Sequence, residues 1–130
     1  MSLVVDTSII IAVLTNEKTK GNLIKATEGE ELLAPSSLHW ELGNAFSAMF
    51  KRKRITLEQA KNALTYYSLI PIRYQEIDMT NSLEIASKYS IYAYDAYFLE
   101  CARKNNCALI TLDQNLKLIA NDMKIKVIEA

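Results

Sequence analysis

Residues 3–8 read Leu3-Val4-Val5-Asp6-Thr7-Ser8, so an acidic side chain directly follows a short apolar run. A second run, Ala108-Leu109-Ile110-Thr111-Leu112, ends at Asp113 in the same way. Short apolar runs of this kind indicate buried strands. Both carboxylates are therefore expected at the C-terminal ends of strands, and that edge is where open parallel sheets bind their ligands.

Apolar runs alternate with helical patterns along the whole chain. We expect strands at 3–5, 31–34, 72–77, 108–112 and 126–128, and helices at 7–14, 20–28, 37–53, 56–68, 81–89, 95–105 and 113–121. The alternation predicts an α/β fold with three layers, in which a central, mostly parallel sheet of about five strands has helices on both faces. The 130 residues contain no linker or repeat, which predicts a single domain over residues 1–130.

Composition narrows the class of protein. The chain has 15 basic and 15 acidic residues and a formal net charge of zero, so overall charge gives no indication of a nucleic-acid partner. Its two cysteines are too few for a disulfide framework. No apolar run approaches the ~18 residues of a membrane span, and the sequence shows no signal-peptide pattern. We therefore expect a cytoplasmic protein that does not enter a membrane.

Two further acidic residues belong with Asp6 and Asp113. Glu41 and Asp95 each lie in the opening turn of an expected helix that could face the same edge of the sheet. Four carboxylates in one place repel each other unless a cation lies between them, and oxygen ligands favour Mg²⁺ or Mn²⁺. The pattern predicts one or two such ions and metal-assisted phosphodiester chemistry. A simpler interpretation stays open, in which each Asp only caps a helix and Glu41 reaches solvent.

In their order and spacing, these motifs resemble the PIN-domain family, and within it the VapC-type toxin ribonucleases of toxin–antitoxin pairs. The resemblance covers essentially the whole chain and rests on four segments: Val5-Asp6-Thr7-Ser8, residues 38–45 around Glu41, Tyr94-Asp95-Ala96-Tyr97, and residues 111–116 around Asp113. It implies a PIN-like fold and an acidic metal site made by Asp6, Glu41, Asp95 and Asp113. The supporting polar side chains are expected to be Ser8, Thr111, Asn44 and Asn115.

The same resemblance implies a Mg²⁺- or Mn²⁺-dependent endoribonuclease that hydrolyses RNA phosphodiester bonds as the toxin of a type II toxin–antitoxin system. We expect Asp6 and Asp95 to bind the metal directly, and Glu41 and Asp113 to bind it directly or through water. A homodimer and a cognate VapB-type antitoxin are the implied protein partners. Two alternatives remain: a catalytically silent PIN-like module that binds RNA or protein, and a phosphotransfer domain. The haloacid-dehalogenase-like form of the latter needs a second Asp where Ser8 stands.

One dense basic run, Lys51-Arg52-Lys53-Arg54, closes the helix expected at 37–53. It is either a solvated helix C-terminus, where positive charge is favourable, or a phosphate-contacting patch at the rim of the acidic site. His39, two residues before Glu41, is interpreted as a packing or hydrogen-bonding residue. Tyrosines such as Tyr66 could stack on bases, but we interpret them as core-edge or interface residues.

Overall fold

A computed structural model of the chain describes residues 1–15, 18 and 20–129. In this part of the chain, four parallel strands form one sheet in the order β3-β2-β1-β4. The strands are β1 (Ser2–Val5), β2 (Glu31–Pro35), β3 (Ile72–Gln75) and β4 (Ala108–Ile110). Because all strands run in the same direction, their C-terminal ends share one edge of the sheet. Asp6 follows β1 at this edge, and Thr111 follows β4.

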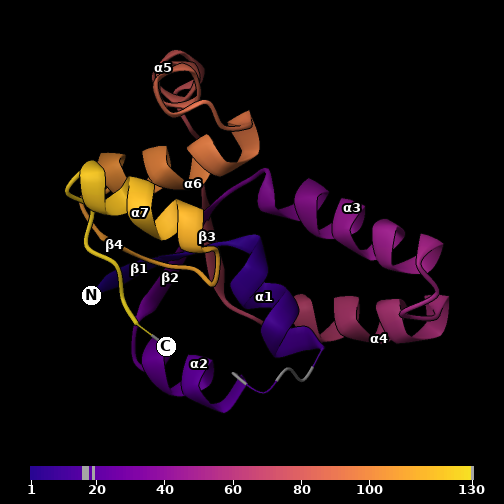
Figure 1. Cartoon of the computed structure of the whole chain (residues 1–130). Coiled ribbons are helices and arrows are strands. Elements are labelled where there is room, and N and C mark those ends of the chain that lie inside the picture. Colours follow the sequence, from indigo (N-terminus) through magenta and orange to yellow (C-terminus); the bar gives the residue numbers. More distant parts are fainter. Residues whose placement is uncertain (16–17, 19, 130) are drawn as a thin grey trace.

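Seven helices accompany these strands within the described residues. They are α1 (Thr7–Leu14), α2 (Lys20–Thr27), α3 (Leu38–Lys51), α4 (Leu57–Tyr67), α5 (Met79–Tyr89), α6 (Ala93–Lys104) and α7 (Gln114–Asp122). Figure 1 shows α5, α6 and α7 on one side of the sheet and α1, α2 and α4 on the other, while α3 runs outward toward its turn into α4. Helix α6 packs across β1, β2 and β4, and α1 contacts both α3 and α4. The α/β architecture predicted from the sequence is confirmed.

The sheet has four strands where the sequence suggested about five. Residues 126–128 form only an isolated bridge, in which Val127 pairs with Leu109. Leu109 donates its N–H to the Lys126 carbonyl and accepts from the Ile128 N–H, both at 2.9 Å. Pairing stops there because β4 ends at Ile110, after which the backbone turns toward the site. The strands expected at 72–77 and 108–112 are also shorter than predicted, because their last two residues lie beyond the C-terminal edge of the sheet.

Local sequence explains where the helices begin. Thr56 and Gln59 form a capping box at α4: the Thr56 hydroxyl accepts from the Gln59 N–H at 3.1 Å, and Gln59 Oε1 accepts from the Thr56 N–H at 2.9 Å. Asp78 caps α5 by accepting from the Asn81 N–H at 2.8 Å. None of the helices over residues 1–15 and 20–129 is long and apolar enough to cross a membrane.

A buried carboxylate of α6, the helix that carries Asp95, forms an ion pair within α6 and a hydrogen bond to α5. Glu100 is fully buried, and its carboxylate accepts from Arg103 Nε at 2.6 Å and from Arg103 Nη2 at 2.8 Å. Asn81 of α5 donates its side-chain amide to Glu100 Oε2 at 3.3 Å. A carboxylate in the core is tolerated because these partners compensate its charge. The rest of the core is mainly apolar and includes Val4, Phe98 and Leu109.

Candidate active site

Asp6 is the most buried member of the acidic set, with 5% of its surface exposed. It is the N-cap of α1, and its Oδ1 accepts from the Ile9 N–H at 3.2 Å and from the Ser8 hydroxyl at 2.6 Å. Its Oδ2 accepts from the Thr111 hydroxyl across the β1–β4 pair. Burial raises the pKa of Asp6 more than these hydrogen bonds lower it. The site therefore fixes this carboxylate in one orientation while making its negative charge costly.

Ser8 and Thr111 support Asp6 and also shape the backbone after β4. Besides binding Asp6, the Ser8 hydroxyl accepts from the Leu112 N–H at 3.0 Å. The Thr111 hydroxyl accepts from the Asp113 N–H at 3.0 Å. Two hydroxyls thus connect the first and the last strand of the sheet around one carboxylate. Ser8 and Thr111 thus contact Asp6, and their supporting role in a metal site stays a prediction.

Glu41 lies in the first turn of α3 and is partly buried. Its Oε2 is buried without a hydrogen-bond partner in the described part of the chain, and so is the hydroxyl oxygen of neighbouring Thr7. Burial raises the pKa of Glu41 to about 7; the nearby Thr7 hydroxyl opposes the rise, and the charges of Asp95 and Asp6 add to it. A buried, unpaired carboxylate oxygen is costly, which favours a ligand at this position.

Asp95 and Asp113 complete the acidic set in different ways. Asp95 stands in the first turn of α6, but the N-cap is Tyr92, so Asp95 does not cap this helix. Asp113 is exposed and caps α7, because its Oδ1 accepts from the Leu116 N–H at 3.0 Å. Burial raises the pKa of Asp95, and the charge of Asp113 raises the pKa values of both Asp95 and Asp6. Charge repulsion therefore links Asp113 to Asp6 and Asp95, and it links Asp6 and Asp95 to Glu41.

The donor set fits a hard divalent cation. Every candidate ligand is a carboxylate oxygen, which suits Mg²⁺ or Mn²⁺. Each carboxylate offers about four lone-pair directions, so Asp6 keeps acceptor capacity beyond its three hydrogen bonds. Among the described residues, no group of three or more His, Cys, Asp or Glu side chains is already arranged to hold a metal ion. The carboxylates must turn toward a common point to ligate one.

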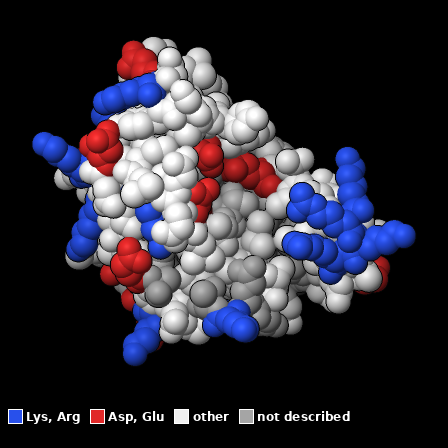
Figure 2. Space-filling model, viewed as in Figure 1, with Lys and Arg blue, Asp and Glu red and all other residues white. Residues whose placement is uncertain are grey.

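Other residues singled out in the sequence lie outside this group. Asn44 and Asn115 are exposed, and neither side chain forms a hydrogen bond with the described residues, so a supporting role for them stays a prediction. Lys51-Arg52-Lys53-Arg54 lies at the outer end of α3, about 15 Å from Glu41 along the helix axis at 1.5 Å per residue. Figure 2 shows acidic surface in a central hollow and a large basic surface over the outer α3–α4 region, on the same face of the molecule.

Sequence reasoning missed a polar network beneath the start of α3. The Tyr67 hydroxyl pairs with His39 Nδ1 at 2.9 Å and with the Tyr74 hydroxyl at 2.6 Å. The rings of His39 and Tyr74 also lie against each other, with centroids 4.2 Å apart. The network joins α3, α4 and β3, and it confirms His39 as a packing and hydrogen-bonding residue. Nothing in a single sequence indicates that these three side chains meet.

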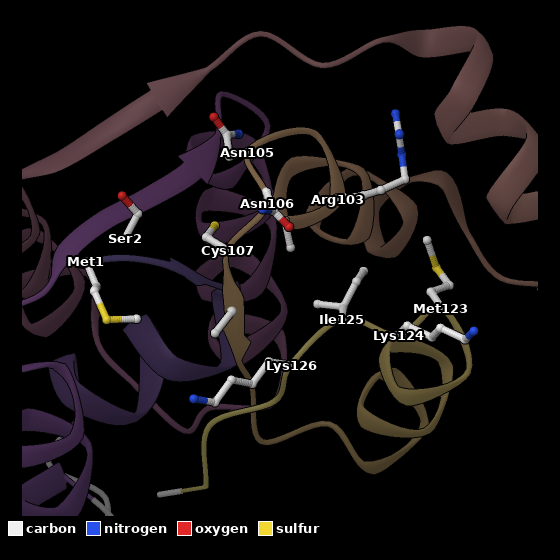
Figure 3. A pocket seen from close by; sticks show the side chains of 12 residues that line it. Met1, Ser2, Arg103, Asn105, Asn106, Cys107, Met123, Lys124, Ile125 and Lys126 are labelled. Carbon is white, nitrogen blue, oxygen red and sulfur yellow. The ribbon is translucent and has the colours of Figure 1, made fainter.

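A cavity in the described part of the chain lies at the opposite edge of the sheet, where the strands begin. It measures about 550 Å³ and is lined by residues near the starts of β1 and β4 and the ends of α6 and α7. Figure 3 shows Cys107 and Ile125 within it, with Asn106 at its margin. None of the four acidic residues contributes to its lining. This cavity is therefore separate from the four acidic residues.

Comparison with known proteins places this geometry in a family. A family model described as PIN domain matches residues 3–122. The chain belongs to the PIN domain family. Ribonuclease VapC9 of Mycobacterium tuberculosis and a VapC ribonuclease of Mycobacterium bovis are each 32% identical to this PIN domain over 116 residues, which cover 88% of this chain and 87% of each relative. The resemblance inferred from the sequence motifs is confirmed.

Solved structures share the PIN fold of this chain. VapBC2 from Rickettsia felis, bound to a promoter DNA fragment, matches with a TM-score of 0.70 and 17% identity, covering 98% of this chain and 97% of that one. VapC20 of Mycobacterium tuberculosis, described as a sarcin-ricin loop cleaving toxin, matches with a TM-score of 0.63 and 13% identity, covering 89% and 93%. A protein from Pyrobaculum aerophilum gives 0.65 and 21%, covering 92% and 87%.

Proposed function

We propose that this PIN domain is a Mg²⁺- or Mn²⁺-dependent endoribonuclease and the toxin of a type II toxin–antitoxin pair. The observation that carries the proposal is the acidic hollow at the C-terminal edge of the sheet, where Glu41 Oε2 is buried without a hydrogen-bond partner in the described part of the chain and the charges of Asp95 and Asp6 raise the pKa of Glu41. Relatives named as VapC ribonucleases support the reaction class. A cluster of repelling carboxylates is costly for a module that only binds RNA, so the catalytically silent alternative is disfavoured.

Each side chain has a defined task in this proposal. Asp6 and Asp95 are the direct ligands, because Asp6 is held by hydrogen bonds and Asp95 is free of any capping role. Glu41 and Asp113 bind directly or through water, and the unpaired Glu41 Oε2 is the free acceptor. A bound divalent ion would lower the pKa of a water molecule and stabilise charge on the leaving oxygen. Ser8 and Thr111 keep the Asp6 carboxylate oriented.

The proposed partners are a second copy of the chain and a VapB-type antitoxin. Large apolar side chains are exposed on the α3–α4 side of the molecule, with Trp40 71% and Leu57 57% exposed, and Leu69 follows at 73%. Exposed apolar surface of this kind supports association with another chain. A structural neighbour was solved as a VapBC2 assembly, which supports an antitoxin of the VapB type.

The test is cleavage of total cellular RNA by purified protein in Mg²⁺ or Mn²⁺, with the new RNA ends mapped. Discrete cuts are expected, and EDTA or Asp6→Asn should remove them. Asp78→Asn is the matched control: Asp78 also caps a helix with its carboxylate but lies outside the acidic set, so this variant should cleave normally. A folded Asp6→Asn protein that still cuts RNA refutes the proposed site. RNA that is bound but never cut by wild type supports the silent module instead.

A further inference from the structure

We propose that the outer end of α3 and the adjoining pocket form a second RNA subsite, which holds backbone phosphates on Lys51-Arg52-Lys53-Arg54 and one unstacked base against Tyr66. The proposal rests on the proposed ribonuclease function and extends it to substrate recognition. In this arrangement the acidic hollow holds the scissile phosphate, and the second subsite holds the same strand further along.

The first observation is the state of the four cations. All four side chains are exposed, and none forms an ion pair with any residue over the described ranges. Helix α3 ends at Lys51, and Lys53 has a left-handed backbone with φ of 56°. The chain therefore reverses within the run, so the cations spread over a turn and not along one helix face. Unpaired cations gathered at a turn suit a phosphate backbone.

The second observation is a pocket that continues from this run. It measures about 450 Å³, lies between α1, α3 and α4, and includes Arg54 in its lining. Leu14, Met49 and Ala63 contribute apolar surface, while Gln59 and Asn62 contribute side-chain amides. Gln59 uses Oε1 in the α4 capping box, which leaves its N–H groups as donors. An unstacked RNA base is recognised by hydrogen bonds to its edge and by contact of its ring with side chains. The amides and the apolar surface of this pocket can supply both.

Tyr66 supplies the stacking surface of this pocket. It lines the pocket and is 66% exposed, and no hydrogen bond from its hydroxyl is seen in the part of the chain that the structure describes. An exposed aromatic ring next to an arginine is the combination on which single-stranded nucleic acids stack. An amphipathic protein helix would also cover the apolar floor. The adjacent run of four unpaired cations favours RNA, because a phosphate backbone offers the matching charge.

The geometry sets how the two subsites share one strand. Lys51 lies about 15 Å from Glu41 along α3, a distance that about four stacked nucleotides span at 3.4 Å each. Both the acidic hollow and the basic surface face the same side of the molecule in Figure 2. A single strand can therefore reach both sites at once, and the second subsite positions the strand without touching the reacting atoms.

The experiment measures RNA binding in EDTA, so that no cleavage is required. Fluorescence anisotropy would follow a labelled single-stranded RNA and a duplex of equal length, each at several salt concentrations. The variant replaces Lys51, Arg52, Lys53 and Arg54 with Gln. Its matched control replaces four exposed lysines elsewhere, Lys25, Lys88, Lys124 and Lys126, and so removes the same charge. Tyr66→Ala and Tyr66→Phe probe the base, and thermal unfolding checks the fold of each variant.

We expect the basic-run variant to reduce the slope of log K against log salt concentration by about two to three. Each phosphate that is no longer neutralised accounts for about 0.7 of this change. The control variant should change the slope by less than about one. Tyr66→Ala should weaken single-stranded RNA about 5- to 150-fold and leave the duplex unchanged, while Tyr66→Phe keeps binding. Equal effects of the two charge variants, no effect of Tyr66→Ala, or no binding by wild type would each overturn the subsite. Wild-type cleavage together with any of these three results refutes the subsite alone, whereas RNA bound here but never cut refutes the nuclease alone.

Discussion

Neutralising Glu41 tests the electrostatics of the acidic hollow without an activity assay. Burial, with the charges of Asp95 and Asp6, raises the pKa of Glu41 from 4.5 to about 7. Between these pH values the unfolded chain has released the Glu41 proton, while the folded chain still holds it. The free energy of unfolding of metal-free protein should therefore decrease as pH rises through this window, and the loss is complete above the upper value.

The size of the effect follows from the same numbers. The interval from 4.5 to about 7 corresponds to about 3 kcal/mol at 1.36 kcal/mol per pH unit. Glu41 is only partly buried and solvent screens part of its charge, so we expect about 1 to 2 kcal/mol. Glu41→Gln keeps the shape and removes the ionisable group. Between about pH 5 and about pH 8 it should lose about 1 to 2 kcal/mol less stability than wild type.

Urea unfolding in EDTA at both pH values, followed by circular dichroism, measures this difference. It corresponds to a change in midpoint of about 0.5 to 1 M for a urea m-value of about 2 kcal/mol/M. Glu84→Gln is the control, because Glu84 is an exposed residue of α5 outside the acidic set. The reasoning is refuted if wild type and Glu41→Gln lose the same stability, or if Glu84→Gln matches Glu41→Gln.

Mn²⁺ at a hundredfold excess over its Kd should stabilise the folded protein by about 2 to 3 kcal/mol. Calorimetry would show this as a higher Tm. An equal rise in Tm for Asp6→Asn would contradict the proposed site. Thr111→Val leaves Asp6 Oδ2 and the Asp113 N–H without a partner and should cost about 1 to 3 kcal/mol in urea unfolding, while exposed Thr65→Val should cost less. Arg103→Met leaves the Glu100 carboxylate buried without its cation and should cost about 3 kcal/mol in the same assay; no loss would contradict the ion pair.

The sequence predicted the helices and the strand edge well because each boundary has a local cause. Asp113 follows an apolar run and caps the next helix, so both of its features are readable over a few residues. Thr56 and Gln59 form a capping box, which predicts the start of α4 from the sequence. Asp95 shows the limit of such local reasoning, since Asp is a favoured N-cap and yet Tyr92 takes that position in α6. Which residue caps depends on how α6 approaches the sheet, and packing sets that approach.

Features that depend on long-range contacts could not be read from the chain. The unpaired Oε2 of Glu41 beside Thr7 arises from how α3 packs against α1, and no spacing rule encodes it. The hydrogen bonds among His39, Tyr67 and Tyr74 join three separate elements. The fifth strand was overcounted because the β-branched residues at 126–128 do not reveal that, within the described residues, this segment forms an isolated bridge to Leu109 and no longer ladder.

The hydrogen bond between Asp6 and Thr111 joins residues 105 positions apart in the chain. During synthesis Asp6 leaves the ribosome before Thr111, which follows 105 residues later, a delay of about 5 to 20 s at 5–20 residues per second. Until then Asp6 has no Thr111 hydroxyl to orient it, and Asp113 does not yet exist. A nascent chain that ends before Asp113 therefore cannot carry an assembled acidic site, so the proposed nuclease activity requires that β4 and Asp113 have been made.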